Sequence, residues 1–345
     1  MARIKDIAEK VAVSSATVSI YLRDRNTTRV GEETKRKIDA AIEELDYRPN
    51  MIARALSTQR SRVIGIMVPY DGPLFGSSFL DSMLSGIQSE LFSRGYSMLF
   101  LPTKGENSPA VVRNQLQVAH GYDGVIIAGT RYCDLDDLKH NVEQLLDSKL
   151  PFATVNMPEL GYEINQAILR VPMEESPIKY LYESGHREVL LLTGRERDSD
   201  SVISIEQYRH HTNRYCDSVD EARIVYGDFE AAVARSAVQS ALASGVAFTG
   251  IHALSDTMAL GAYDALEEAG LVVPKDVSVV GMNDSGFCRH MSPPLTTYRR
   301  PIFDAGREAG RALLGTLETG RVGRKVFLDG ELVLRGSTKA IRVTT

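Results

Sequence analysis

From Val63 onward, the sequence contains two series of short apolar runs, and stretches with helical periodicity separate the runs. The first series is VIGIMV (63–68), MLFL (98–101), GVIIA (124–128) and FATV (152–155); the second is VLLLTG (189–194), RIVYG (223–227), GIHAL (250–254) and VSVVGM (277–282). Continuous apolar strands that alternate with helices predict parallel sheets covered on both faces. We therefore expect an α/β fold with two similar lobes and a ligand cleft at the carboxyl ends of the strands.

The residues before Val63 have a different pattern, which predicts three short helices. Ile4, Ile7 and Val11 recur at helical spacing, and a second helix follows Ser14, a suitable N-cap. The third, over 32–45, is amphipathic. Only a few residues separate the first two helices, so a tight turn must join them, as in a helix-turn-helix unit.

The distribution of charge supports a nucleic-acid module at this end of the chain. The whole protein has a net charge of -5, but residues 1–60 contain twelve basic and nine acidic side chains and are therefore positive. A small basic segment on an acidic body is typical of a DNA-binding module joined to a larger domain.

In a helix-turn-helix, side chains near the start of the second helix contact base edges in the major groove. Here these base-reading candidates are Ser15, Ala16, Thr17 and Ile20. Ser14, Ser19 and Tyr21 are placed to reach phosphates or flanking edges, and such contacts set register without reading sequence. The alternative is an ordinary three-helix surface unit.

The segment RPNMIARALSTQRS (48–61) follows the headpiece. Pro49 suits the first turn of a helix, because its missing N–H has no partner to lose there. The helix that it could start is barely two turns long and would be marginal in isolation. We expect an element that is ordered only when something holds it.

The strings IKDIAEKVAVSSATVSIYL and VGEETKRKIDAAIEELDYRPNMIARAL closely resemble the headpiece of LacI/GalR-type repressors. Later segments, among them YDGVIIAG, YESGHREVLLLTG, SDTMALGAYDALEEAG and SPPLTTYRRP, follow the same family in order along the chain. The resemblance implies a type I periplasmic-binding-protein-like core. It divides the chain into a headpiece (1–47), a hinge helix and linker (48–61) and a core (62–345), with one lobe over about 62–157 and 293–322 and the other over about 158–292 and 323–345.

The resemblance also implies roles for individual residues. Leu56 matches the leucine that wedges into the central base step and kinks the duplex, and Asn50 and Ala53 match its neighbours in the minor groove. The alternative for Leu56 is a linker leucine that packs on its own domain. Arg29 is one of the basic side chains expected on phosphates. Ile20 and Ala12 depart from the family pattern, which usually has a polar base-reading residue and a turn glycine there, so the operator sequence cannot be transferred.

In the core, the family pattern places four residues at the effector cleft. Phe75 and Phe229 match aromatic positions, with a core aromatic as the alternative for each. Asp256 matches an acidic hydrogen-bond acceptor, with a helix N-cap as the alternative. Ser204 stands where the family usually has a ligand-clamping arginine.

Further departures flank these positions. Gln207 replaces a glycine, and Met173 and Glu174 replace an Asp-Asn pair. Together with Ser204, these changes predict a cleft that lacks the arginine and is more acidic. We expect a small-molecule effector, a sugar, nucleoside or similar, that is unusual: cationic, weakly bound, or absent.

Other classes of protein lack support in the sequence. No catalytic, cofactor or metal motif occurs, and the adjacent His210 and His211 would diverge on a helix. No apolar run is long enough to span a membrane and no signal peptide is present, while the scattered Cys133, Cys216 and Cys288 fit reduced thiols in the cytoplasm. We expect no enzyme, but a homodimeric or tetrameric repressor on a pseudo-palindromic operator. The rival is a sugar-type binding protein without DNA function.

Overall fold

A computed structural model of the chain describes residues 2–47, 60–69, 75–101, 121–129 and 135–341. These residues form two compact units, Met1–Ser61 and Arg62–Thr345. The expected hinge helix falls almost wholly on residues 48–59, outside the described residues.

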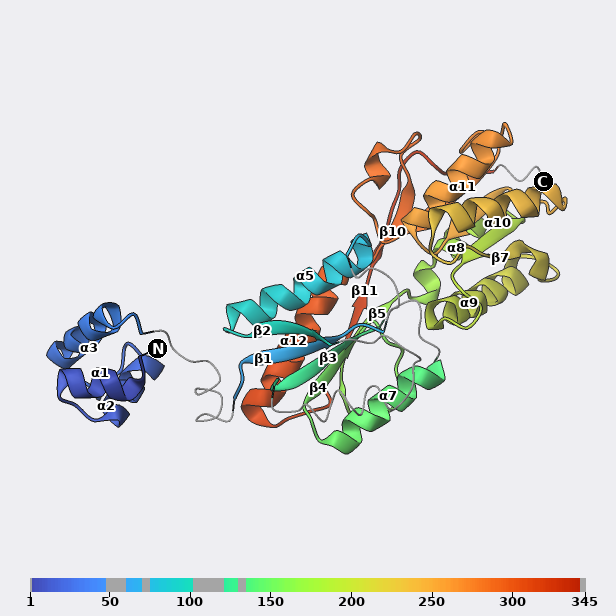
Figure 1. The fold of residues 1–345 in the computed structure, drawn as a ribbon. Coiled ribbons are helices and arrows are strands. Elements are labelled where there is room, and N and C mark those ends of the chain that lie inside the picture. Colours follow the sequence, from blue (N-terminus) through green and yellow to red (C-terminus); the bar gives the residue numbers. More distant parts are fainter. Residues whose placement is uncertain (1, 48–59, 70–74, 102–120, 130–134, 342–345) are drawn as a thin grey trace. The chain divides into compact units, whose positions relative to one another are not determined.

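The first unit contains three helices around a small core of its own (Figure 1): α1 (Ile4–Val11), α2 (Ser15–Arg23) and α3 (Glu32–Glu44). Ile7, Val18 and Ile38, one from each helix, are fully buried together. Ala12 ends α1 in the left-handed conformation, with φ 56°, and the chain then turns directly into α2. This arrangement confirms the predicted helix-turn-helix unit.

The second unit contains two six-stranded sheets, as the two series of apolar runs predicted. The first has the order β11-β5-β4-β3-β1-β2, and all its pairs are parallel. Its strands are β1 (Val63–Met67), β2 (Ser97–Leu101), β3 (Gly124–Ala128), β4 (Phe152–Val155), β5 (Asn165–Arg170) and β11 (Lys325–Asp329). Helices α5 (Ser78–Ser93) and α12 (Ile302–Thr319) share a core with one face, and α7 (Leu135–Ser148) shares a core with the other.

The second sheet has the order β12-β10-β9-β8-β6-β7 and is parallel except for the β10–β12 pair. Its strands are β6 (Val189–Thr193), β7 (Ile224–Tyr226), β8 (Gly250–Ala253), β9 (Ser278–Met282), β10 (Thr296–Arg299) and β12 (Glu331–Val333). Four helices accompany this sheet: α8 (Pro177–Glu183), α9 (Ser199–Tyr215), α10 (Ala231–Ala243) and α11 (Asp256–Glu268).

Strand pairing corrects the expected lobe boundaries. β5 and β11, which we assigned to the second lobe, pair with each other over five residues in the first sheet. β10, which we assigned to the first lobe, pairs with β9 in the second. The chain therefore crosses between lobes after Arg170, near Arg300 and at Gly330 (Figure 1). The physical reason is that membership of a sheet is decided by pairing with distant strands, which a local apolar run does not encode.

Helices α5 and α12 pack against each other through glycines. A Cβ on Gly86 would lie 2.0 Å from the carbonyl oxygen of Phe303, and one on Gly306 would lie 2.2 Å from that of Met83. The two backbones are therefore in direct contact, and no larger residue fits at either position without moving a helix. Within the described ranges, no helix has the length and apolar character that a membrane crossing requires.

Candidate DNA-binding face and ligand cleft

The start of α2 presents a solvent-facing set of small side chains. Ser15 and Ala16 are exposed, while Thr17, Ser19 and Ile20 are half-buried. Ile20 packs in part against the core of the headpiece. The outward-facing first turn has the geometry that a helix needs to approach base edges in a major groove.

The other DNA-contact candidates in the headpiece differ in how free their side chains are. Ser14 is the N-cap of α2: its hydroxyl accepts a hydrogen bond from the backbone N–H of Thr17 at 3.0 Å. Tyr21 is buried, and its hydroxyl donates to Asp39 at 2.5 Å. Arg29 is exposed. Tyr21 thus holds α2 against α3 in this structure, while Arg29 is available to a phosphate. Asn50, Ala53 and Leu56 lie outside the described residues.

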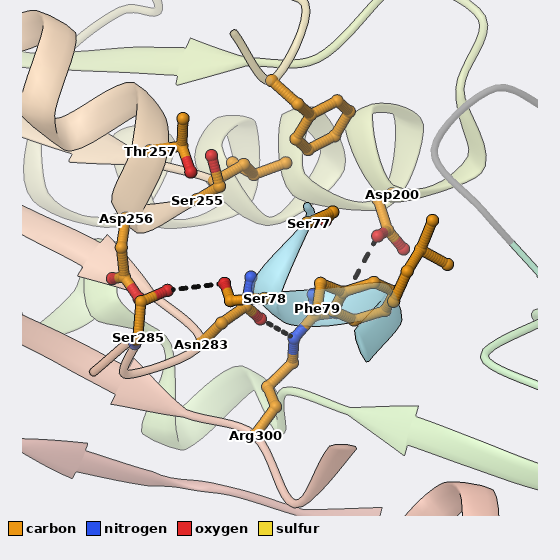
Figure 2. A pocket seen from close by; sticks show the side chains of 13 residues that line it. Ser77, Ser78, Phe79, Asp200, Ser255, Asp256, Thr257, Asn283, Ser285 and Arg300 are labelled. Carbon is orange, nitrogen blue, oxygen red and sulfur yellow. Dashed lines mark hydrogen bonds and ion pairs between the residues drawn. The ribbon is translucent and has the colours of Figure 1, made fainter. Parts of the chain in front are cut away.

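A cleft lies in the second unit, lined by residues from both lobes (Figure 2). The first lobe contributes the start of α5, and the second contributes the starts of α9 and α11 and the segments after β7, β8 and β9. Three helix N-termini therefore meet this cleft, each with a partial positive charge. The lining residues are Ser77, Ser78, Phe79, Leu80, Asp200, Phe229, Leu254, Ser255, Asp256, Thr257, Asn283, Ser285 and Arg300.

Asp256 lines the cleft, but its carboxylate is already engaged inside the second lobe. The carboxylate accepts hydrogen bonds from the Thr297 hydroxyl at 2.6 Å and from the backbone N–H of Ser285 at 2.6 Å. Its side chain is almost fully buried, and burial raises the pKa of the carboxyl group. The N-cap of α11 is Ser255, not Asp256. Asp256 thus anchors the segment after β9, a role that neither of the two sequence interpretations contained.

Of the two predicted aromatic residues, only Phe229 lies at the cleft. Phe229 lines the cleft, and its ring covers Gly194 so closely that a Cβ there would lie 2.1 Å from it. Phe229 also has a left-handed backbone, with φ 57°, which costs free energy and marks a conformation held by its surroundings. Phe75 is 66% exposed, packs edge-to-face on Phe100 and is not among the lining residues. The first lobe instead supplies Phe79.

Arg300, which was not among the predicted site residues, carries the positive charge of the cleft. Its side chain is 8% exposed. Nε donates to Oδ1 of Asn283 at 2.8 Å, Nη1 lies 3.8 Å from Oδ2 of Asp200, and the guanidinium stacks over the Phe79 ring at 5.1 Å (Figure 2). Burial lowers the pKa of this guanidinium. The only local signal was the doubled arginine in YRRP, which does not reveal which of the two faces inward.

The expectation of an acidic cleft without an arginine is therefore wrong. Ser204, on α9, is not a lining residue, and Glu174 is 67% exposed and forms an ion pair with Lys179 at 3.2 Å. Gln207 donates to the carbonyl of Val171 at 2.9 Å, which ties α9 to the first crossing between the lobes. The sequence could not show that another arginine, from a distant segment, occupies the cleft.

Asn283 and Asp284 follow β9 with φ values of 103° and 55°. Such conformations are rare outside glycine and persist only where contacts hold them. Here the contacts are the bond from Arg300 to Asn283 and those from Arg299 and Arg335 to Asp284, at 2.8 and 2.6 Å. In the part of the chain that the structure describes, no group of three or more His, Cys, Asp or Glu side chains is arranged to hold a metal ion.

Comparisons with known proteins agree with this geometry. Residues 3–50 match the family "Bacterial regulatory proteins, lacI family", and residues 178–338 match a periplasmic binding protein-like domain. The HTH-type transcriptional repressor PurR of Vibrio atlanticus is 30% identical over 347 residues, which cover 99% of this chain and 100% of that protein. The HTH-type transcriptional repressor CytR of Escherichia coli is 28% identical over 348 residues, covering 99% and 97%.

Solved structures support the same architecture. The Lac repressor dimer bound to operator and the anti-inducer ONPF matches with a TM-score of 0.83 and 25% identity over 98% of this chain and 99% of that one. The transcriptional regulator CelR in complex with cellobiose matches with a TM-score of 0.70 and 23% identity over 98% of this chain and 100% of that one, a likeness of fold.

Proposed function

The chain belongs to the LacI family of bacterial regulatory proteins, and from this premise we propose that it acts as a homodimer on a pseudo-palindromic operator under the control of a small molecule in the cleft. As a member of that family it is a DNA-binding transcriptional repressor with an effector-binding core, and not an enzyme. The rival interpretation, a binding protein without DNA function, is contradicted by the family match over residues 3–50.

The observation that carries the DNA-binding part of the proposal is the exposed first turn of α2 on a unit with its own core. Ser15 and Ala16 are the most accessible candidates for base contacts, and Ile20 is placed one turn later on the same helix. An isoleucine can contact the methyl group of thymine but cannot form a hydrogen bond to a base edge. We therefore expect operator half-sites in which a thymine faces Ile20.

The homodimer is supported by the Lac repressor match, whose solved form is a dimer on operator. A dimer carries two copies of α2, and its two-fold symmetry requires two inverted half-sites. We further propose a hinge helix and linker over 48–61, in which Leu56 wedges into the central base step with Asn50 and Ala53 beside it.

The cleft is proposed as the effector site because residues of both lobes line it. A ligand that contacts both lobes favours the arrangement in which both sets of contacts can form. Arg300 lies at a crossing between the lobes and its side chain lines the cleft. Ligand binding to Arg300 would therefore favour one arrangement of the two lobes over another at this crossing. Allosteric control requires two such arrangements whose populations a ligand can shift.

The test is selection of bound sequences from a random duplex pool with the full chain, followed by gel-shift titration of the selected sequence. We expect an inverted repeat, with one half-site for each headpiece. A matched pair of variants, Ser15→Glu on the exposed turn of α2 and Ser236→Glu on the exposed surface of α10, adds the same charge at two places. Only Ser15→Glu should abolish selected binding. Recovery of no enriched sequence at low salt would reject the proposal.

A further inference from the structure

The lining of the cleft contains charged groups of both signs. Asp200, Asp256 and Arg300 are the ionisable groups among its lining residues. Asp256 is turned to internal partners, and its raised pKa makes its negative charge less favourable. Arg300 and Asp200 are therefore the two charged groups of the cleft lining that face a ligand (Figure 2).

The Arg300 guanidinium keeps donors that no described residue uses. Nε is bonded to Asn283, but the 3.8 Å separation of Nη1 from Asp200 is too long for a hydrogen bond. Within the described part of the chain, Nη2 has no hydrogen-bond acceptor. Arg300 lines the cleft, and the planar fork of a guanidinium fits carboxylate or phosphate oxygens.

The first turn of α5 provides a second set of unused donors beside this arginine. Ser77 does not cap the helix with its side chain, and the backbone N–H groups of Ser78, Phe79 and Leu80 have no acceptor among the described residues. The Arg300 guanidinium stacks on the ring of Phe79, so the arginine lies next to the start of α5. Unused amides at the start of a 16-residue helix bind anions through hydrogen bonds and the helix dipole.

We propose that the cleft selects an effector that carries an anionic group, a carboxylate or a phosphate, bound between Arg300 and the first turn of α5. This inference rests on the proposed role of the cleft as the effector site. Asp200, 28% exposed at the same cleft, faces the remainder of the ligand and accepts hydrogen bonds from its hydroxyl or amine groups. The ligand is thus a small polar molecule with one acidic end.

The test is isothermal titration of the full chain, without DNA, against inorganic phosphate and against matched pairs: ribose with ribose 5-phosphate, and glucose with glucose 6-phosphate and with gluconate. We expect the anionic member of a pair to bind at least about tenfold more tightly than the neutral one, because a bidentate charge-assisted contact is gained. The phosphate and gluconate arms decide between a phosphate and a carboxylate.

Variants assign the preference to the proposed contacts. Arg300→Gln should remove the preference for the anion, and Arg300→Lys should retain only part of it, because the charge stays and the planar fork is lost. Arg235→Gln removes an equal charge from an exposed ion pair with Glu268 and should have no effect. Asp200→Asn should strengthen anion binding several-fold, since a repelling charge is removed, and this gain of affinity requires a folded cleft.

Three results would overturn the inference. The first is a neutral sugar that binds as tightly as its phosphorylated or carboxylated form, and the second is an Arg300→Gln chain that keeps the preference for the anion. The third is the absence of binding by every anionic probe up to about 50 mM, a concentration that exceeds even a weak dissociation constant of about 1 mM. Failure of the duplex selection described above would reject the DNA-binding proposal and leave the titrations intact. Selected DNA binding with no anion preference would reject this inference alone.

Discussion

The hydroxyl groups of Ser78 and Ser285 lie 3.0 Å apart and join the two lobes across the cleft. Ser78 begins α5 in the first lobe, and Ser285 follows β9 in the second, where its backbone N–H is held by Asp256. One short polar contact thus connects a rigid segment of one lobe with the start of a helix in the other, and it favours a closed cleft.

Ser78→Ala should loosen this closure. A lost neutral hydrogen bond costs about 0.5–1.5 kcal/mol, so exchange of the hydrogen-bonded backbone amides of residues 283–285 should rise by roughly two- to tenfold. Ser85→Ala is the control, because that hydroxyl donates to the Asp81 carbonyl within α5. Equal exchange in wild type and Ser78→Ala would mean that this contact does not hold the lobes together.

Ala12→Gly should stabilise the headpiece. Ala12 has φ 56° and ψ 44° at the end of α1, a left-handed conformation that costs an alanine about 1 kcal/mol and a glycine almost nothing. Protection of α1 and α2 amides from hydrogen exchange in the full chain should therefore increase several-fold. The matched change Ala40→Gly, at an exposed position within α3, should lower protection by about 0.5–1 kcal/mol. Opposite signs for the same chemical change would assign the effect to backbone conformation.

Arg29→Ala and Ile20→Ala should affect operator binding in different ways. Arg29 is exposed and is proposed to contact phosphate, so its loss should weaken binding to all sequences and reduce the salt slope by about 1. Ile20→Ala should leave that slope unchanged and relax the preference at one base pair of each half-site. Gel-shift titrations at several salt concentrations, on the selected operator and a scrambled duplex, separate the two. A slope unchanged in Arg29→Ala would remove this arginine from the phosphate contacts.

Leu56→Ala should reduce both operator affinity and DNA bending while the dimer stays intact. An apolar wedge compensates the cost of unstacking, a few kcal/mol, through the added contacts that bent DNA permits. Circular-permutation mobility reports the bend, and sedimentation velocity reports the dimer. Unaltered bending would favour the alternative that Leu56 packs on its own domain.

The free energy of unfolding should decrease below neutral pH because of His252. This side chain on β8 is buried, and burial lowers the pKa of its imidazole to about 4. Below the ordinary value of 6.5, the unfolded chain therefore binds a proton that the folded chain does not, so the free energy of unfolding decreases as the pH drops from 6.5 towards 4. The complete loss is roughly 3 kcal/mol.

Urea unfolding at a series of pH values measures this dependence. His252→Asn should flatten the curve in that window, and the exposed His290→Asn should not. Asp198 acts in the opposite direction: burial raises the pKa of its carboxyl group to about 6, so the folded chain keeps a proton that the unfolded chain releases. A curve that stays equally steep in His252→Asn would exclude this histidine as its source.

The sequence was sufficient to predict the two α/β lobes, the headpiece and all eight strands of the two apolar series. It did not reveal β5, β10, β11 and β12, because all four adjoin the lobe crossings and the sheet to which each belongs is fixed only by distant partners. Apolar periodicity reports burial along one segment, and it carries no information on pairing between segments 159 residues apart, such as Gln166 and Lys325.

The cleft was predicted less well for a related reason. Phe229 was identified through the family resemblance, because the segment GDF (227–229) matches an aromatic position of that pattern. Arg300 was missed because its position depends on Phe79 and Asn283, from two other segments. Asp256 was identified, but its hydrogen bonds to Ser285 and Thr297 come from residues that no local pattern connects to it.

The backbone contacts of Gly86 with Phe303 and of Gly306 with Met83 bear on how this repressor can evolve or be redesigned. Because the two backbones touch there, α5 and α12 can only shift as one body, and α12 begins two residues after Arg300. Changes in ligand preference can therefore accumulate at Phe79, Asp200 or Phe229 without loss of the mechanical link. A library that aims at new effectors should leave both glycines fixed, and one that aims at a weaker or stronger response to the same effector should begin with them.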